Sequence, residues 1–292
     1  VSVSVSVSVS VAGEQAGRLA ASDVAQVLWA LARLPSPSPP PPSSQPHLCE
    51  QQQQQQQQRV ERGGGGGGRG GRTGREELLD RVEARALQVA SGLSGQEVAQ
   101  TLLALASLPP RSSSSSCSGG GALLSSLCDQ AARAAPRMSP QQLANVLWAL
   151  GRLGLLPADS LLHALADRAL LLQHSFQPQE VSSMLWAAGR LGLHAHVPEL
   201  LHALARQASL LTGEMGAQGH ANCLWALAAL PPHPYMLPLL HALADHVSVE
   251  RLQGVHRAQA HQFLLSARLD PALHALLPPK LAALAEAHGK EG

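Results

Sequence analysis

SPQQLANVLWALGRLGL, residues 139–155, is the stretch that decides the fold, because close relatives of it recur along the chain. When the six copies are aligned on the tryptophan, one shared reference position holds Trp29, Leu103, Trp148, Trp186, Trp225 and Leu264. The last three intervals are 38, 39 and 39 residues, a period typical of helical solenoids. We therefore number six units and give positions relative to the reference residue.

A second leucine-rich segment, LLHALA, follows the tryptophan segment in units three to five, at 161–166, 200–205 and 239–244. Proline near the helix starts and glycine just past the first helices are typical of short helices joined by turns. Aromatic residues make up 2% of the chain and apolar residues 45%, so Leu and Ala must form the core. The pattern predicts an all-α fold, an α-solenoid of about six two-helix units.

Low-complexity sequence interrupts the period in the first two units. One insertion, 35–75, holds proline, glutamine and glycine tracts, and a second, 109–121, is rich in serine and glycine. Such segments bury too little apolar surface to order themselves. We expect a disordered N-terminal segment at 1–21, a solenoid at 22–286 that carries both insertions between the helices of a unit, and a C-terminal tail at 287–292.

Composition limits the class of protein. The net charge is only +1, so any binding of nucleic acid must come from a local arrangement of side chains. The four cysteines form no C-x-x-C pair, which favours a reducing compartment. No run approaches the roughly 18 to 20 apolar residues of a membrane helix. We expect a soluble protein without a membrane partner.

The apolar positions of each first helix fall on one side at 100° per residue. In unit three this predicted core face holds Leu143, Val146, Leu147, Leu150 and Leu153. Small residues flank the core face and would let neighbouring first helices approach closely. In unit three they are Ala144, Ala149 and Gly151.

The remaining side of the first helix is a stripe that holds the reference residue and the positions seven before, three before and four after it. Three before, the side chains are neutral, form hydrogen bonds and differ between units: Gln26, Gln100, Asn145, Ser183, Asn222 and His261. Four after, four units carry arginine: Arg33, Arg152, Arg190 and Arg268. Variable amides can address base edges and arginines can hold phosphates, as in helical-repeat RNA binders. The alternative is a merely solvated helix face.

The tryptophans of the stripe also allow two interpretations. Trp29, Trp148, Trp186 and Trp225 could stack on bases, a contact worth about 1 to 3 kcal/mol each. A tryptophan repeated in register could instead fill the seam between adjacent helices, where it buries a large area. We favour the seam.

No catalytic or metal site stands out. His163, His202 and His241 recur once per unit, so packed helices would hold them about 10 Å apart, too far for shared metal coordination. The glycines of 63–71 lack the Lys and Ser/Thr of a phosphate loop. We expect no enzymatic activity, no cofactor, no metal and no small-molecule substrate. The stretch RGGGGGGRGG makes diffuse RNA contacts or is a plain linker.

The residues PQQLANVLWALGRLG, followed by a leucine-rich helix at this period, closely resemble the octotricopeptide repeats of green-algal organelle RNA-binding proteins. They are also similar to the FAST leucine-rich repeats of mitochondrial RNA-processing proteins. The resemblance covers 22–34 and most of 76–270. The proline-rich element that the family carries in its second helix, and its small RAP domain, are not evident.

The resemblance implies an organellar protein that binds single-stranded RNA and controls the stability, processing, splicing or translation of particular transcripts. It favours the chloroplast stroma over the mitochondrial matrix and allows other RNA-processing proteins as partners, although no targeting peptide is visible in VSVSVSVSVS. The alternative is a protein-interaction scaffold, since related solenoids bind peptides in the same groove. Peptide grooves need apolar pockets or a steady charge, whereas this stripe alternates amides with arginines.

Overall fold

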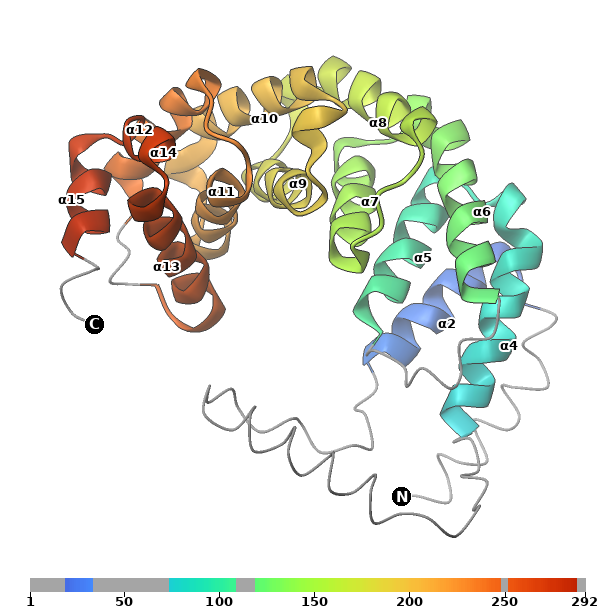
Figure 1. Cartoon of the computed structure of the whole chain (residues 1–292). Coiled ribbons are helices and arrows are strands. Elements are labelled where there is room, and N and C mark those ends of the chain that lie inside the picture. The colour runs from blue at the N-terminus through green and yellow to red at the C-terminus, as the bar shows by residue number, and fades with distance from the viewer. Residues whose placement is uncertain (1–18, 34–73, 109–118, 248–251, 288–292) are drawn as a thin grey trace, which may run out of the picture.

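Two layers of helices form an arc (Figure 1). The computed structural model describes residues 19–33, 74–108, 119–247 and 252–287, and every regular element in these ranges is a helix. The inner layer holds the first helices of the units: α2 (Ala21–Arg33), α5 (Gly95–Ser107), α7 (Pro140–Leu153), α9 (Pro178–Leu191), α11 (Ala217–Ala229) and α13 (Gly254–Leu269). The second helices are α4 (Gly74–Val89), α6 (Gly119–Ala134), α8 (Asp159–Leu171), α10 (Pro198–Leu211), α12 (Leu237–His246) and, in unit six, α14 (Pro271–His274) and α15 (Pro279–Ala287).

Consecutive inner helices pack against each other along the whole arc, from α2 through α13. The predicted all-α helical-repeat architecture is therefore confirmed. Short 3₁₀ turns connect many of the helices: η3 (Ala90–Gly92), η5 (Ala135–Arg137), η6 (Gln173–Ser175), η7 (Leu193–Ala195), η8 (Thr212–Glu214) and η9 (Pro234–Met236). Among the described helices, none combines the length and the apolar character needed to cross a membrane.

Several predicted boundaries fall outside the described residues. The N-terminal segment, the two insertions and the C-terminal tail lie wholly or mainly in the undescribed ranges 1–18, 34–73, 109–118 and 288–292. At their inner ends, α4 begins at Gly74 and α6 at Gly119. Both helices thus start slightly earlier than the low-complexity composition predicted.

Local sequence explains where the inner helices begin and end. At the start of α7, the Ser139 hydroxyl accepts from the backbone of Gln142 and the Gln142 side chain accepts from the backbone of Ser139, a capping box. Pro140 sits at the first helical position, where a missing N–H costs nothing. Gly154 ends α7 and Gly192 ends α9 in the left-handed conformation with φ of 65°, as glycine permits.

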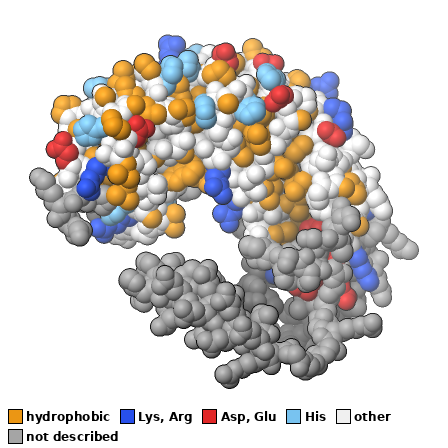
Figure 2. Space-filling view, in the orientation of Figure 1, with side chains coloured by type: hydrophobic (Ala, Val, Ile, Leu, Met, Phe, Trp, Pro, Cys, Tyr) orange, Lys and Arg blue, Asp and Glu red, His pale blue; other side chains and the backbone are white. Residues whose placement is uncertain are grey.

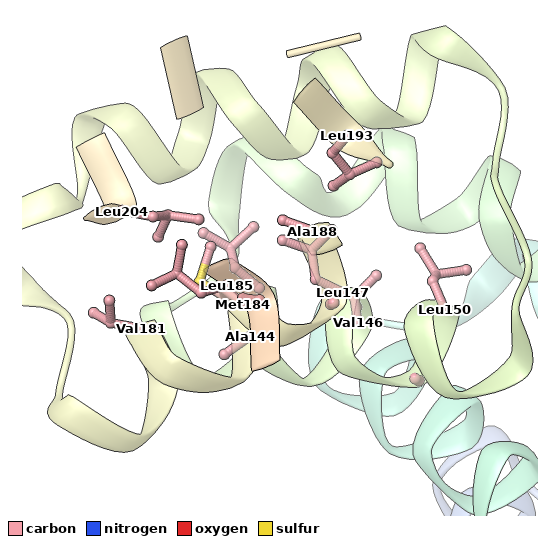
Figure 3. Close-up of a cluster of buried hydrophobic side chains, with 14 of the residues drawn as sticks. Ala144, Val146, Leu147, Leu150, Val181, Met184, Leu185, Ala188, Leu193 and Leu204 are labelled. Carbon is pink, nitrogen blue, oxygen red and sulfur yellow. The ribbon is translucent and has the colours of Figure 1, made fainter. Parts of the chain in front are cut away.

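The core lies between the two layers. In α7 the predicted core face is buried at Leu143, Val146, Leu147 and Leu150, while Leu153 is half-buried. Figure 3 shows side chains of α7 and α9 gathered beneath the outer helix that carries Leu204. This apolar contact stabilises each unit and joins it to the next, at about 25 cal/mol per Å² of apolar surface buried.

Small residues set the distance between inner helices. A Cβ placed on Gly151 of α7 would lie 3.0 Å from Ala187 Cα and 3.2 Å from Trp186 Cζ3 of α9. A Cβ on Gly189 of α9 would lie 3.2 Å from Ala226 Cα of α11. The backbones are therefore as close as glycine and alanine allow, which confirms the role predicted for these positions.

Outer helices are tied to the start of their own unit by a hydrogen bond that recurs in three units. A long side chain at the equivalent position of the outer helix donates to a backbone carbonyl just before the inner helix. The pairs are Arg85 Nε to Leu19 O, Gln130 Nε2 to Leu93 O, and Arg168 Nε to Met138 O. These bonds were not predicted, because the outer helices share too little sequence to reveal the position.

Unit six is aligned differently from the sequence prediction. The buried residues of α13 are Ala260, Phe263, Leu264 and Ala267. In α7 and α9 the corresponding buried positions lie five, two and one before the reference and two after it. The burial in α13 fits this spacing only when Leu265 is the reference residue, so the predicted alignment on Leu264 was one residue too early.

The outer part of unit six is also shorter than PALHALL suggested. α14 ends at His274, and the segment 275–278, which ends in Pro278, separates it from α15, whose first residue is Pro279. Proline removes a backbone donor and restricts the residue before it. A continuous second helix is therefore replaced by two short ones.

Replacing Gly151 by leucine tests whether close helix approach sets the packing. Leucine is the better helix former by up to about 1 kcal/mol, yet the side chain would collide with α9. We expect Gly151→Leu to lower the free energy of unfolding by roughly 2 kcal/mol or more, as overpacking does, measured by urea denaturation. Gly121→Leu is the control: a Cβ at Gly121 meets nothing within 4 Å, so it should be neutral or stabilising. Equal effects at both sites would contradict the account.

Candidate functional site

Stripe residues of consecutive units line an open hollow of about 520 Å³ on the inner helices. α7 contributes Gln141, Asn145 and Trp148, and α9 contributes Gln179 and Ser183. Gln141 and Gln179 lie seven before the reference residue, Asn145 and Ser183 lie three before it, and Trp148 is the reference residue of α7. The predicted stripe therefore faces a shared space at this junction of units.

A second hollow of about 370 Å³ continues the first toward unit five. Its lining includes Asn222 of α11, and Gln177, Gln179 and Gln218 line both hollows. We call the two connected hollows the amide groove, defined by Gln141, Asn145, Gln179, Ser183, Gln218 and Asn222. Neutral amide and hydroxyl groups thus follow one another over three units.

Three tryptophans form a row beside the amide groove. The ring centroids of Trp148 and Trp186 are 6.4 Å apart, and those of Trp186 and Trp225 are 5.8 Å apart, all tilted by 35° to 38°. Each of the three rings is half-buried. Because Trp186 also covers Gly151 of the preceding unit, the seam interpretation describes these residues well, and the remaining ring surface faces outward.

Arg152 of unit three and Arg190 of unit four differ in their hydrogen bonds. Arg152 Nε donates to Ala106 O at the end of α5, 2.9 Å away, and its guanidinium lies 5.6 Å from the centre of the Trp148 ring. In the next inner helix the equivalent carbonyl, Gly151 O, accepts from the Gly154 backbone instead. Arg190 is exposed and has no partner among the described residues. It is therefore available to bind an anion.

The other predicted residues of units one and two lie outside the amide groove. Gln26 is exposed on α2 and Gln100 is half-buried on α5, and neither lines the two hollows. Trp29 is 43% exposed, more than the tryptophans of the row. Arg33 ends α2, but its side chain lies outside the described residues.

The corrected alignment of unit six removes His261 and Arg268 from the predicted stripe. With Leu265 as the reference, they lie four before and three after it, where α7 carries Ala144 and Gly151. His261 accepts from Arg257 at 3.4 Å and Arg268 is exposed. The stripe positions of α13 instead hold Gln262, Leu265 and Leu269.

Sequence reasoning missed the glutamines of the groove. Gln141, Gln179 and Gln218 all occupy the second residue of their helices, seven before the reference, and all are exposed. The position belongs to the predicted stripe, and Gln96 occupies it in unit two as well. The same residue in four consecutive units is the signal that could have found them.

Most of the groove is electrically neutral. Two carboxylates also line it: Glu180, one oxygen of which accepts from the Gln177 backbone in a capping box, 2.8 Å away, and the exposed Glu214. Asn222 is 6% exposed and its side-chain oxygen accepts from Gln259 of α13. Recognition here must depend mainly on hydrogen bonds and ring surfaces, because no arginine lines the two hollows.

Histidines gather on the outer side of the arc, over the outer helices (Figure 2). His163 Nδ1 contacts Asp159 O at 2.7 Å, whereas the His202 ring packs on Tyr235 with centroids 4.4 Å apart. Within the described ranges, no three His, Cys, Asp or Glu side chains come together as a metal site.

The two described cysteines are poor nucleophiles. Burial raises the pKa of Cys223 to about 12. Burial, assisted by the charge of Asp129, raises the pKa of Cys128 to about 11. Since the thiolate is the reactive form, both side chains remain protonated and unreactive at neutral pH.

The chain matches no protein-family model and no curated protein sequence. Membership of the octotricopeptide-repeat family stays a prediction. A function for this chain must therefore be inferred from the groove itself.

Trp186 variants separate seam packing from aromatic contact. Leu103 and Leu265 occupy the same position in units two and six, so leucine suits the stack. We expect Trp186→Leu to cost about 1 kcal/mol of unfolding free energy and Trp186→Ala about 2 to 3, less than the roughly 3 to 5 of a fully buried ring. Urea denaturation of both variants measures this. Equal losses would show that the ring is required for reasons other than filling the seam.

Proposed function

We propose that this protein binds single-stranded RNA along the amide groove. The observation that supports the proposal is the continuity of the groove: neutral hydrogen-bonding side chains from three consecutive units face one space beside a row of tryptophans. Unpaired bases offer hydrogen-bonding edges and flat faces, and amides and aromatic rings are the side chains that bind them.

Side chains three before the reference would select the base. The position holds asparagine in units three and five, Asn145 and Asn222, and serine in unit four, Ser183, so neighbouring units differ, as expected if they contact different bases. Asn and Gln amides both donate and accept, whereas a serine hydroxyl is shorter. Polar side chains that only solvated the face of a helix would not need to line a groove shared with the next unit.

Two arginines of the stripe, which lie outside the lining of the two hollows, supply a modest attraction for phosphate. Arg190 has no partner among the described residues, and Arg152 keeps two of its nitrogens free of the bond to Ala106. Guanidinium groups pair well with phosphate oxygens. With a net charge of +1, the protein would depend more on fitted contacts than on its overall field.

The cellular role is proposed from the resemblance of the repeats to octotricopeptide repeats. It is post-transcriptional control of organellar transcripts, through their stability, processing, splicing or translation. The chloroplast stroma is the proposed location, and other RNA-processing proteins are proposed partners.

A protein-interaction scaffold is the second candidate, because α13 carries exposed apolar side chains, including Leu269 at the position where α7 and α9 carry arginine. Val255, Leu265 and Leu269 are 74%, 42% and 78% exposed. Exposed leucines in register along one helix are typical of helix-docking surfaces. This feature lies in unit six, apart from the amide groove.

Binding of a random-sequence 12-nucleotide RNA pool, labelled with fluorescein, tests the proposal. We expect the double variant Asn145→Leu, Ser183→Leu to weaken binding at least about tenfold, because it removes two hydrogen-bonding groups worth roughly 0.5 to 1.5 kcal/mol each and fills the groove. Fluorescence anisotropy at low salt measures the affinity. His163→Leu, an exposed change on the outer helix α8, is the control. Absence of binding, or equal loss in the control, would overturn the proposal.

The dependence of affinity on salt tests Arg190. Each phosphate contact to a single strand contributes about −0.7 to the slope of log K against log salt. We expect Arg190→Gln to make the slope shallower by about this amount, without changing which sequences are enriched from the pool. Arg206→Gln, on the exposed side of α10, should leave the slope unchanged. An unaltered slope in Arg190→Gln would show that this arginine does not contact phosphate.

A further inference from the structure

We propose that Gln141, Gln179 and Gln218 bind the ribose 2′-hydroxyl groups of the strand and so select RNA over DNA. The inference rests on the proposed function, single-strand binding in the amide groove. It adds a row of side chains that recognises the sugar, distinct from the residues that select the base.

Repetition of one residue type indicates what these side chains can contact. The three glutamines occupy the same place in α7, α9 and α11 and line the hollows. Four residues further along each helix, the side chain changes from Asn145 to Ser183. A side chain identical at every step cannot distinguish bases that differ. It can recognise a group that every nucleotide carries, which is either the phosphate or the ribose.

The amides of these glutamines are available to a ligand. Within the described residues, none of the three side chains forms a hydrogen bond. The residue that follows each of the first two performs the capping: Gln142 accepts from the Ser139 backbone, and Glu180 accepts from the Gln177 backbone. The glutamines are therefore not needed to cap their own helices.

Because the three glutamines are uncharged, ribose is a better partner for them than phosphate. The first turn of a helix favours Asp or Glu, because backbone N–H groups point toward it. Glutamine forgoes that stabilisation at all three positions, and so adds no further repulsion of a phosphodiester strand to that of Glu180 and Glu214, which also line the hollows. A 2′-hydroxyl both donates and accepts, which matches a primary amide, whereas phosphate only accepts and is better served by Arg190.

The distance between the tryptophans of successive units suits an extended strand, in which each ribose is separately exposed. Tryptophan centroids advance by 6.4 and 5.8 Å per unit, nearly twice the rise of about 3.4 Å per nucleotide in a stacked strand. A strand that keeps step with the units must therefore be unstacked and extended. Each glutamine could then meet one sugar.

The test compares three random-sequence 12-nucleotide pools, identical except at the sugar: ribose, 2′-deoxyribose with uracil retained, and 2′-O-methylribose. By fluorescence anisotropy, we expect the protein to bind the RNA pool at least about tenfold more tightly than the deoxy pool. The O-methyl pool should bind like the deoxy pool, because it has lost the donor. This comparison changes the probe alone, so it does not depend on how any variant folds.

The triple variant Gln141→Ala, Gln179→Ala, Gln218→Ala should bring RNA affinity down to about that for DNA, and leave DNA affinity unchanged. Ser160→Ala is the matched control, since Ser160 is the exposed second residue of the outer helix α8; both affinities should stay as they are. Thermal melting should be the same for all proteins.

Three results would overturn the inference. Equal affinity of the protein for RNA and DNA pools would overturn sugar selection while leaving single-strand binding in place. Equal loss of RNA and DNA affinity in the triple variant would assign the glutamines to bases or phosphates. Failure to bind any pool would overturn the proposed function itself, and the inference with it.

Discussion

Close contact between the backbones of successive inner helices is the constraint on which the rest of the structure depends. Gly151 meets Ala187 with no room for a further carbon atom, and the contact recurs at Gly189 and Ala226. Because the inner helices lie this close, the tryptophan rings reach one another across units and the polar stripes of three helices line one groove. A wider spacing would separate the stripes into isolated helix faces.

Hydrogen bonds to the backbone groups at the helix ends then decide which polar side chains are available to a ligand. The Gly154 backbone donates to Gly151 O of α7, and Arg190 has no hydrogen-bond partner among the described residues, whereas Arg152 donates to Ala106 O at the end of α5. At the helix starts, Gln142 completes a capping box and the adjacent Gln141 is left unbonded. Residues of the same type thus differ in availability because of the backbone groups around them.

Unit six differs from the preceding units at the positions that set the distance between inner helices. The positions that hold small residues in α7 hold His261 and Arg268 in α13, and large polar side chains there oppose close approach of another helix. The inner surface changes too, because exposed Leu265 and Leu269 take the places that tryptophan and arginine hold in α7 and α9.

The sequence by itself determined the repeat, the helix period, the buried face and the small residues between units. These follow from local spacing, as the buried Leu143, Val146 and Leu147 of α7 illustrate. Only the tertiary structure decided which stripe residues share a groove, that Arg152 is engaged while Arg190 is free, and that α13 is aligned on Leu265. Each of these depends on contacts between helices that are distant in sequence or on burial, and neither can be obtained from the spacing of residues along one helix.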